Sequence, residues 1–149
     1  MSNNYQVADI LYFEKYCFTD TGGIASHFAL VTLPSYALRF PGSSKRLYNN
    51  LLCAVITSQK PRSFYLLLLC RKYSFFSKPS YACFDRMDIN CVDDLDSKHN
   101  QPLGSLDKPD VAKSLKAIRS VLYGSPKFND PYMRGSIIRE WKKKRDNLP

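Results

Sequence analysis

The sequence contains no apolar run long enough to cross a membrane. The longest run extends from Phe64 to Cys70, whereas a transmembrane helix needs about 20 apolar residues. The opening stretch from Met1 to Val7 is polar, so no signal peptide is expected. These absences favour a cytoplasmic protein that has no membrane partner.

The cysteines lack the Cys-x-x-Cys spacing that is typical of zinc and redox sites. Their number is odd, and three of them lie within apolar or aromatic runs, which predicts reduced and buried thiols. A metal site would have to combine scattered cysteines with His27 and His99, so neither a metal nor a cofactor is predicted. The five are Cys17, Cys53, Cys70, Cys83 and Cys91.

Acidic residues are in the minority, with 13 against 22 basic residues and a net charge of +9. This excess favours a polyanionic partner, such as nucleic acid or an acidic protein surface. Many small soluble proteins are also basic, so charge alone does not choose between these partners. The length of 149 residues and a hydrophobic content of 44% are sufficient for one folded domain.

Five apolar stretches have the length and composition of β-strands. The third stretch is followed by a short connection, Thr57 to Arg62, which is short enough for a hairpin with the fourth. The abundance of aromatic residues also suits a β-rich body. The predicted strands cover Val7 to Phe13, Ser26 to Leu33, Leu51 to Ile56, Ser63 to Arg71, and Tyr81 to Ile89.

Two helices are predicted after the strands. Asp107 can cap the first helix, Pro109 lies in its first turn and Gly124 marks its end. Asp130-Pro131 can open the second helix. Apolar residues recur at helical spacing in both: Val111, Leu115, Ile118 and Leu122, then Met133, Ile137, Ile138 and Trp141.

The order of these elements predicts a mainly β fold with helices (α+β). We expect a small antiparallel barrel with a packed C-terminal helix over residues 1–124, followed by a basic helical appendage over residues 125–149. The second helix can dock through Trp141 and end in a solvated tail from Lys142 to Arg145. Alternatively, that tail can contact phosphates.

The third strand, from Leu51, leaves the core at three small polar residues: Thr57, Ser58 and Gln59. Two hydroxyls and an amide at the end of a rigid strand are well placed to hold a ligand, because the strand fixes their positions. The simpler alternative is a strand followed by a polar turn.

Several segments, taken in order, resemble the PemK/MazF family of toxins. The most specific is the Ile-Thr-Ser-Gln sequence within Ala54 to Gln59. Ser80 to Arg86 resembles the family's strand that carries an aspartate, and Leu103 to Leu106 resembles its Gly-x-Leu element before the last helix. The remaining segments are Ala8 to Leu11 and His27 to Val31.

The resemblance implies an SH3-like barrel that forms a homodimer. It further implies a toxin of a toxin–antitoxin system, which inhibits growth as a sequence-selective, metal-independent endoribonuclease acting on single-stranded RNA. The expected protein partner is a cognate antitoxin. Thr57 and Ser58 match the family's active-site hydroxyls, and Asp85 matches its acidic residue.

The chain departs from the family at two positions. Where the family has an Arg followed by Pro in the second strand, this chain has His27 and Phe28. His27 can serve as an acid or base near neutral pH; alternatively it is a surface residue of a degenerate site, and the protein is a non-catalytic module that binds nucleic acid or a protein. The family's opening Gly-Asp is Ala8-Asp9 here.

Metal-free RNA cleavage uses the neighbouring 2′-hydroxyl as nucleophile. In that scheme His27 moves protons, Thr57 and Ser58 hold the phosphate, and Asp85 orients a basic partner or accepts a proton. Arg86 is expected on the opposite face of the strand from Asp85. The predicted RNA-binding residues are Gln59, Lys45, Arg46, Arg62, Arg71, Lys72 and Tyr73.

Overall fold

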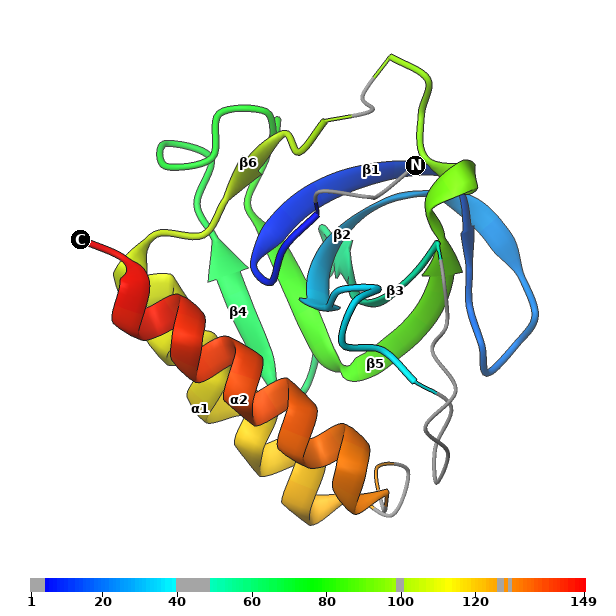
Figure 1. The fold of residues 1–149 in the computed structure, drawn as a ribbon. Helices are drawn as coiled ribbons and strands as arrows, with labels where there is room; N and C mark the ends of the chain where they lie inside the picture. Colours follow the sequence, from blue (N-terminus) through cyan, green and yellow to red (C-terminus); the bar gives the residue numbers. More distant parts are fainter. Residues whose placement is uncertain (1–4, 40–48, 99–100, 126–127, 129) are drawn as a thin grey trace.

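The chain forms a curled, six-stranded antiparallel sheet with two helices packed against one face (Figure 1). The computed structural model describes residues 5–39, 49–98, 101–125, 128 and 130–149. The predicted α+β class, a β-barrel type of fold with C-terminal helices, is confirmed. Among the described helices, none is long and apolar enough to cross a membrane.

The elements follow one another along the chain much as the apolar pattern predicts. The strands are β1 Asp9–Cys17, β2 Ile24–Leu33, β3 Asn50–Thr57, β4 Tyr65–Leu68, β5 Ser80–Cys91 and β6 Gly104–Ser105. A short 3-10 turn, η1 Val92–Asp94, follows β5, and the helices are α1 Lys108–Gly124 and α2 Pro131–Asn147.

The order of strands across the sheet is β4-β5-β3-β2-β1-β6. The predicted hairpin between β3 and β4 is therefore wrong, because β5 lies between them. β5 is long enough to pair with both: Tyr81 lies opposite Thr57 of β3, and opposite Leu67 of β4. The connection from Thr57 to Arg62 thus leads past β5 to β4 instead of making a tight turn.

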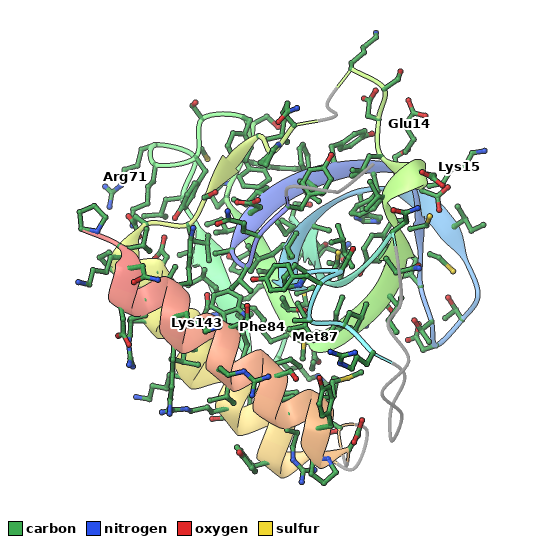
Figure 2. The ribbon with its side chains drawn as sticks, in the orientation of Figure 1. Glu14, Lys15, Arg71, Phe84, Met87 and Lys143 are labelled. Carbon is green, nitrogen blue, oxygen red and sulfur yellow. The ribbon has the colours of Figure 1, made fainter. Side chains whose placement is uncertain are left out.

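The two faces of the sheet carry different parts of the core, because side chains alternate along each strand. The helix face packs against α1 and α2; Figure 2 shows Phe84 and Met87 projecting from β5 between the sheet and the helices. The other face, here called the far face, carries a second cluster that includes Leu11, Ala29 and Val55.

Hydrogen bonds tie the end of β1 to the second half of β5 and so close the curl of the sheet. The Tyr16 hydroxyl donates to Asp88 Oδ2 at 2.7 Å, and the Thr19 N–H donates to Asp88 Oδ1 at 2.8 Å. Asn90 Oδ1 accepts from the Cys17 N–H at 2.7 Å. Asp88 and Asn90 are buried, so these partners are needed to satisfy their polar atoms.

The turn before β1 forms with Ala8 where the resembling family has glycine. Ala8 has a φ of 75°, a left-handed conformation that glycine adopts without steric cost. Its N–H donates to the Val31 carbonyl at 2.9 Å, and its side chain is fully buried. The substitution therefore leaves the turn in place, with a strained residue within it.

The second helix docks on the sheet through Trp141, as predicted from the sequence. The Trp141 side chain is fully buried, and its indole Nε1–H donates to the Thr32 carbonyl at 2.9 Å. Its ring packs edge-on against Phe84, with the centroids 6.5 Å apart. Ile137 and Trp141 belong to the same core cluster as the strands and α1, so α2 completes the core of the barrel.

Candidate functional site

His27 and Thr57 directly adjoin the last paired residues of β2 and β3. Phe28 pairs with Ile56 in this antiparallel ladder, so one step further along each strand brings His27 opposite Thr57. Side chains at opposed positions share one face and lie about 5 Å apart at Cβ. The structure thus brings together two of the four predicted catalytic residues.

The His27 ring is held by aromatic neighbours and by a backbone carbonyl. It lies perpendicular to the Phe18 ring, 5.3 Å between centroids, and 6.3 Å from the ring of Tyr16. Nδ1 lies 3.4 Å from the Ile56 carbonyl oxygen. A carbonyl can only accept, so this contact favours a proton on Nδ1 and leaves the lone pair on Nε2.

Burial and hydrogen bonding fix the position and the protonation of the Tyr16 side chain, which lies beside His27. Burial raises the pKa of the Tyr16 hydroxyl far above its ordinary value of 10.0, and the neighbouring Cys53 and Asp88 raise it further. The hydroxyl therefore stays protonated and continues to donate to Asp88. Tyr16 is a rigid wall beside His27, not a second acid or base.

The polar residues at the end of β3, here called the polar exit, are Thr57, Ser58 and Gln59, and their side chains are at least partly exposed. Thr57 is half-buried, and its Oγ1 accepts the Gln59 N–H at 3.2 Å. A hydroxyl that accepts in this way still has a proton to donate. Ser58 and Gln59 are exposed. Thr57 is thus the hydroxyl next to His27, and the exposed Ser58 and Gln59 follow it in the connection after the strand.

The row of opposed side chains continues across the far face to the edge of the sheet. Thr57 pairs with Tyr81 of β5, which pairs with Leu67 of β4. Strands lie about 4.8 Å apart, so the row from His27 to Leu67 extends about 14 Å. The row crosses four strands.

Tyr81 on this row, and Tyr65 and Lys60 close to it, were not predicted from sequence. Tyr65 and Tyr81 pack edge-on with centroids 5.5 Å apart, and Lys60 Nζ lies 5.8 Å from the centre of the Tyr65 ring. Both rings are half-buried, which leaves part of each accessible. The alternation of side chains along a strand predicts that Tyr81 and Cys83 lie on the same face of the sheet. That Thr57 also lies on this face follows only from the pairing of β3 with β5.

Asp85 makes no contact with His27 among the described residues. Between Ala82 and Met87 the pairing of β5 with β3 is interrupted, and the exposed Asp85 and Arg86 lie in that irregular stretch. No hydrogen bond or ion pair among the described residues joins Asp85 to His27 or Thr57. The alternation that separated Arg86 from Asp85 in the prediction does not apply within this stretch.

Asp85 influences Cys83 instead. The pKa of the Cys83 thiol is raised to about 11, mainly by burial and also by the charge of Asp85, while Arg86 acts in the opposite direction. All five cysteines are free, as predicted, although Cys70 is only half-buried. No three histidine, cysteine or acidic side chains gather as a metal-binding group in the part of the chain that the structure describes.

Lys72 and Tyr73, predicted to bind RNA, have structural partners at the start of α1. Tyr73 is 5% exposed, and its hydroxyl donates to the buried Asp110 at 2.6 Å. Lys72 Nζ lies 2.8 Å from an Asp107 oxygen and 3.2 Å from an Asp110 oxygen. Tyr73 has no face available for a base, so its predicted role in RNA binding is corrected.

The other predicted RNA-binding residues do not all lie near His27 and Thr57. Arg62 is exposed on the connection that starts at Ser58. Figure 2 shows Arg71 at the opposite side of the molecule from Glu14, which follows Phe13, the β1 partner of His27. Lys45 and Arg46 lie outside the described residues. The described cations nearest in sequence to the polar exit are therefore Lys60 and Arg62.

Phe75 and Phe76 are adjacent on the loop between β4 and β5, and Phe76 belongs to the core. Phe76 is 4% exposed and packs against Phe28, with centroids 5.0 Å apart. Phe75 covers Gly104, where an added Cβ would lie 3.0 Å from Phe75 Cε1. The loop between β4 and β5 thus fills the core and does not supply stacking aromatics through these two rings.

Comparison with known proteins identifies no family. No protein-family model matches the chain, and no curated protein matches it in sequence. The function proposed below therefore depends on the residues of the site and on the resemblance of short segments.

Proposed function

We propose that this protein is a metal-independent endoribonuclease that cleaves single-stranded RNA and acts as the toxin of a toxin–antitoxin system. The observation that carries the proposal is the juxtaposition of His27 and Thr57 at the open end of the far face. A histidine with a directed lone pair beside a hydroxyl is the minimum set for activating a 2′-hydroxyl next to a phosphate.

The chemistry follows from the orientation of the His27 ring. Nε2 accepts the proton of the 2′-hydroxyl as that oxygen attacks the adjacent phosphorus. The bond from phosphorus to the 5′-oxygen then breaks, and that oxygen takes up a proton from water, which leaves a 2′,3′-cyclic phosphate and a 5′-hydroxyl. Thr57 and Ser58 donate to the non-bridging oxygens, where negative charge develops.

Lys60 and Arg62 add positive charge to the same end of the sheet, and Tyr81 and Tyr65 offer ring surface to unpaired bases. Stacking on such rings is tolerant of sequence because every base has a flat face. The net charge of +9 supports attraction of a polyanion.

The test is incubation of purified protein with single-stranded RNA in excess chelator. Cleavage that yields 2′,3′-cyclic phosphate ends is expected. His27→Ala and Thr57→Ala should each slow it, by about 100-fold for the loss of the proton acceptor. Ser120→Ala, on the exposed side of α1, is the control and should cleave at the wild-type rate.

A fully 2′-O-methylated RNA of the same sequence separates cleavage from binding. It lacks the nucleophile but keeps the bases and phosphates, so it should bind without being cut. Absence of cleavage of the normal RNA, or cleavage unchanged by both substitutions, would refute the enzyme. Cleavage that stops on chelation would refute the metal-free mechanism.

The absence of a contact between Asp85 and His27 among the described residues favours a second candidate, a non-catalytic module that binds nucleic acid or a protein through the same face. A histidine also lacks the permanent charge of the arginine that the resembling family has there. Tight binding of both the normal and the methylated RNA, with neither cut, would select this candidate.

The toxin role has its own test in cells. Expression of the wild-type chain should arrest growth, expression of His27→Ala should not, and an acidic partner protein should relieve the arrest. The expected homodimer can be measured by sedimentation of the purified protein.

A further inference from the structure

β4 forms one edge of the sheet, and no described strand lies on its outer side. The Phe84 N–H donates to the Phe64 carbonyl at 2.9 Å. Hydrogen-bonded pairs alternate in an antiparallel ladder, so the next such pairs join Leu66 to Ala82 and Leu68 to Ser80. The backbone N–H and C=O groups of the intervening residues, Tyr65 and Leu67, consequently point to the open edge.

The β4 strand is only four residues long, but it contains no charged residue, no proline and no bulge that would hinder pairing with another chain. Charged residues, proline and bulges normally protect an exposed edge. Tyr65–Leu68 is Tyr-Leu-Leu-Leu, and its pairing with β5 is regular. Leu67 is 41% exposed and the adjoining Phe64 is 40% exposed. An apolar, regular and open edge is suited to accept a further strand.

A groove of about 220 Å³ runs between this edge and the first turns of α1. Tyr65, Leu67 and Leu69 line one side, and Lys72, Asp110 and Lys113 line the other. The Leu69 carbonyl already accepts the N–H groups of Lys72 and Tyr73, so the accessible edge ends there. The groove has room for the side chains of a short extended segment.

The charges around the groove favour an acidic occupant. Lys72 is paired with Asp107 and Asp110. Lys113 is exposed and has no carboxylate partner among the described residues, and Lys60 lies over Tyr65 on the other side of the edge. A second copy of this chain, at +9, would bring like charges together, whereas an acidic segment is attracted.

We propose that the β4 edge binds an extended, acidic segment of another protein, which adds a strand to the sheet. The segment's backbone pairs with Tyr65 and Leu67. Its alternate side chains point toward α1, where acidic groups meet Lys113, and toward the far face, where apolar groups cover Leu67. This inference does not depend on ribonuclease activity.

The test uses the full chain and a short fluorescent peptide of alternating glutamate and valine, with binding measured by anisotropy. Leu67→Pro removes the backbone N–H that points to the open edge. It leaves the hydrogen bonds between β4 and β5 in place, because the Leu67 N–H does not take part in them. It should weaken binding about tenfold, whereas the control Leu67→Val keeps the N–H and should bind like the wild type. Lys113→Glu should also weaken binding, with an effect that diminishes in high salt.

Methylated peptides give a second measurement that uses only the wild-type protein. Methyl groups on the alternate amides that face β4 should abolish binding, and methyl groups on the other amides should not. Equal binding by the two methylated peptides, or no binding of the parent peptide, would overturn the proposal. So would a dimer of this chain that Leu67→Pro dissociates and the peptide does not disturb.

Discussion

Ser114 is a fully buried residue of α1 whose hydroxyl has no hydrogen-bond partner among the described residues. A buried and unsatisfied hydroxyl costs about 1–3 kcal/mol, and serine is a weaker helix former than alanine by about 0.5 kcal/mol. Ser114→Ala should therefore raise the free energy of unfolding by about 1–2 kcal/mol, measured by urea denaturation.

Ser120→Ala is the matched control on the same helix. Ser120 is exposed, and its hydroxyl donates to the Lys116 carbonyl at 3.2 Å. That substitution changes helix propensity without removing a buried polar group, so its gain should stay near 0.5 kcal/mol. Equal gains at the two positions would show that the Ser114 hydroxyl is satisfied.

The stability of the protein should depend on pH through the ionisation of Asp9. Burial raises the pKa of its carboxyl, while hydrogen bonds from Ser105 and Gln6 and the charge of Lys144 act in the opposite direction. A carboxyl with a raised pKa in the folded state is easier to ionise when unfolded. The free energy of unfolding should therefore fall as the pH rises from about 3.8, the ordinary value, through the folded-state pKa.

Asp9→Asn isolates this contribution, because an amide does not ionise. Its loss of one acceptor oxygen, for either the Gln6 N–H or the Ser105 hydroxyl, shifts stability by an amount independent of pH. The wild-type value minus the variant value, from urea unfolding at pH 4 to 7, should decrease with pH. A flat or rising difference would contradict the assignment.

At the scale of elements, the start of α1 combines a cap with an ion pair. The Asp107 side chain accepts the Asp110 N–H at 3.0 Å and also contacts Lys72. Asp107→Ala loses both and should lower the free energy of unfolding by about 1–2 kcal/mol. Asp107→Asn keeps a capping oxygen and should cost less. If both substitutions lower the free energy of unfolding by a similar amount, the ion pair between Asp107 and Lys72, rather than the cap, stabilises the helix end.

The strands and helices were largely predictable from sequence, because their signals are local. Apolar runs marked β1 to β5, and an aspartate followed within two residues by a proline marked the start of each helix. The order of the strands was not predictable from the same signals. A short connection after Thr57 is compatible with a hairpin or with a crossing, and only the pairing of β5 with both neighbours decides between them.

The same limit explains which site residues could be found. Thr57 and Ser58 were identifiable because a buried strand ends at them, and His27 because of its position in a resembling segment. Tyr81 required knowledge of the register between β3 and β5. Asp85 was placed in the site because it matches the acidic residue of the resembling family, and the interruption of the β5–β3 pairing at this point could not be read from the sequence.

At the scale of the whole molecule, α2 is part of the folding unit. Trp141 fills the space between α2 and the sheet and is fully buried. Trp141→Ala should cost about 3–5 kcal/mol, a large share of the roughly 5–15 kcal/mol by which domains are stable. Thermal unfolding should show a much lower Tm, whereas the exposed neighbour Lys142→Ala should leave it unchanged. Retention of the wild-type Tm by Trp141→Ala would indicate that α2 does not contribute to the barrel's stability.

The distribution of charge over the molecule allows the proposed RNA face to be tested separately from net charge. Each phosphate contact adds about 0.7 to the slope of log affinity against log salt for single strands. If RNA lies along the row from His27 to Tyr81, Lys60→Ala and Arg62→Ala should each weaken binding of a 2′-O-methylated RNA and reduce that slope by about 0.7. Arg71→Ala removes the same charge from the opposite side of the molecule to Glu14, so its slope should remain that of the wild type. If all three substitutions reduce the slope equally, the attraction arises from overall charge, and the far face has no special part in binding.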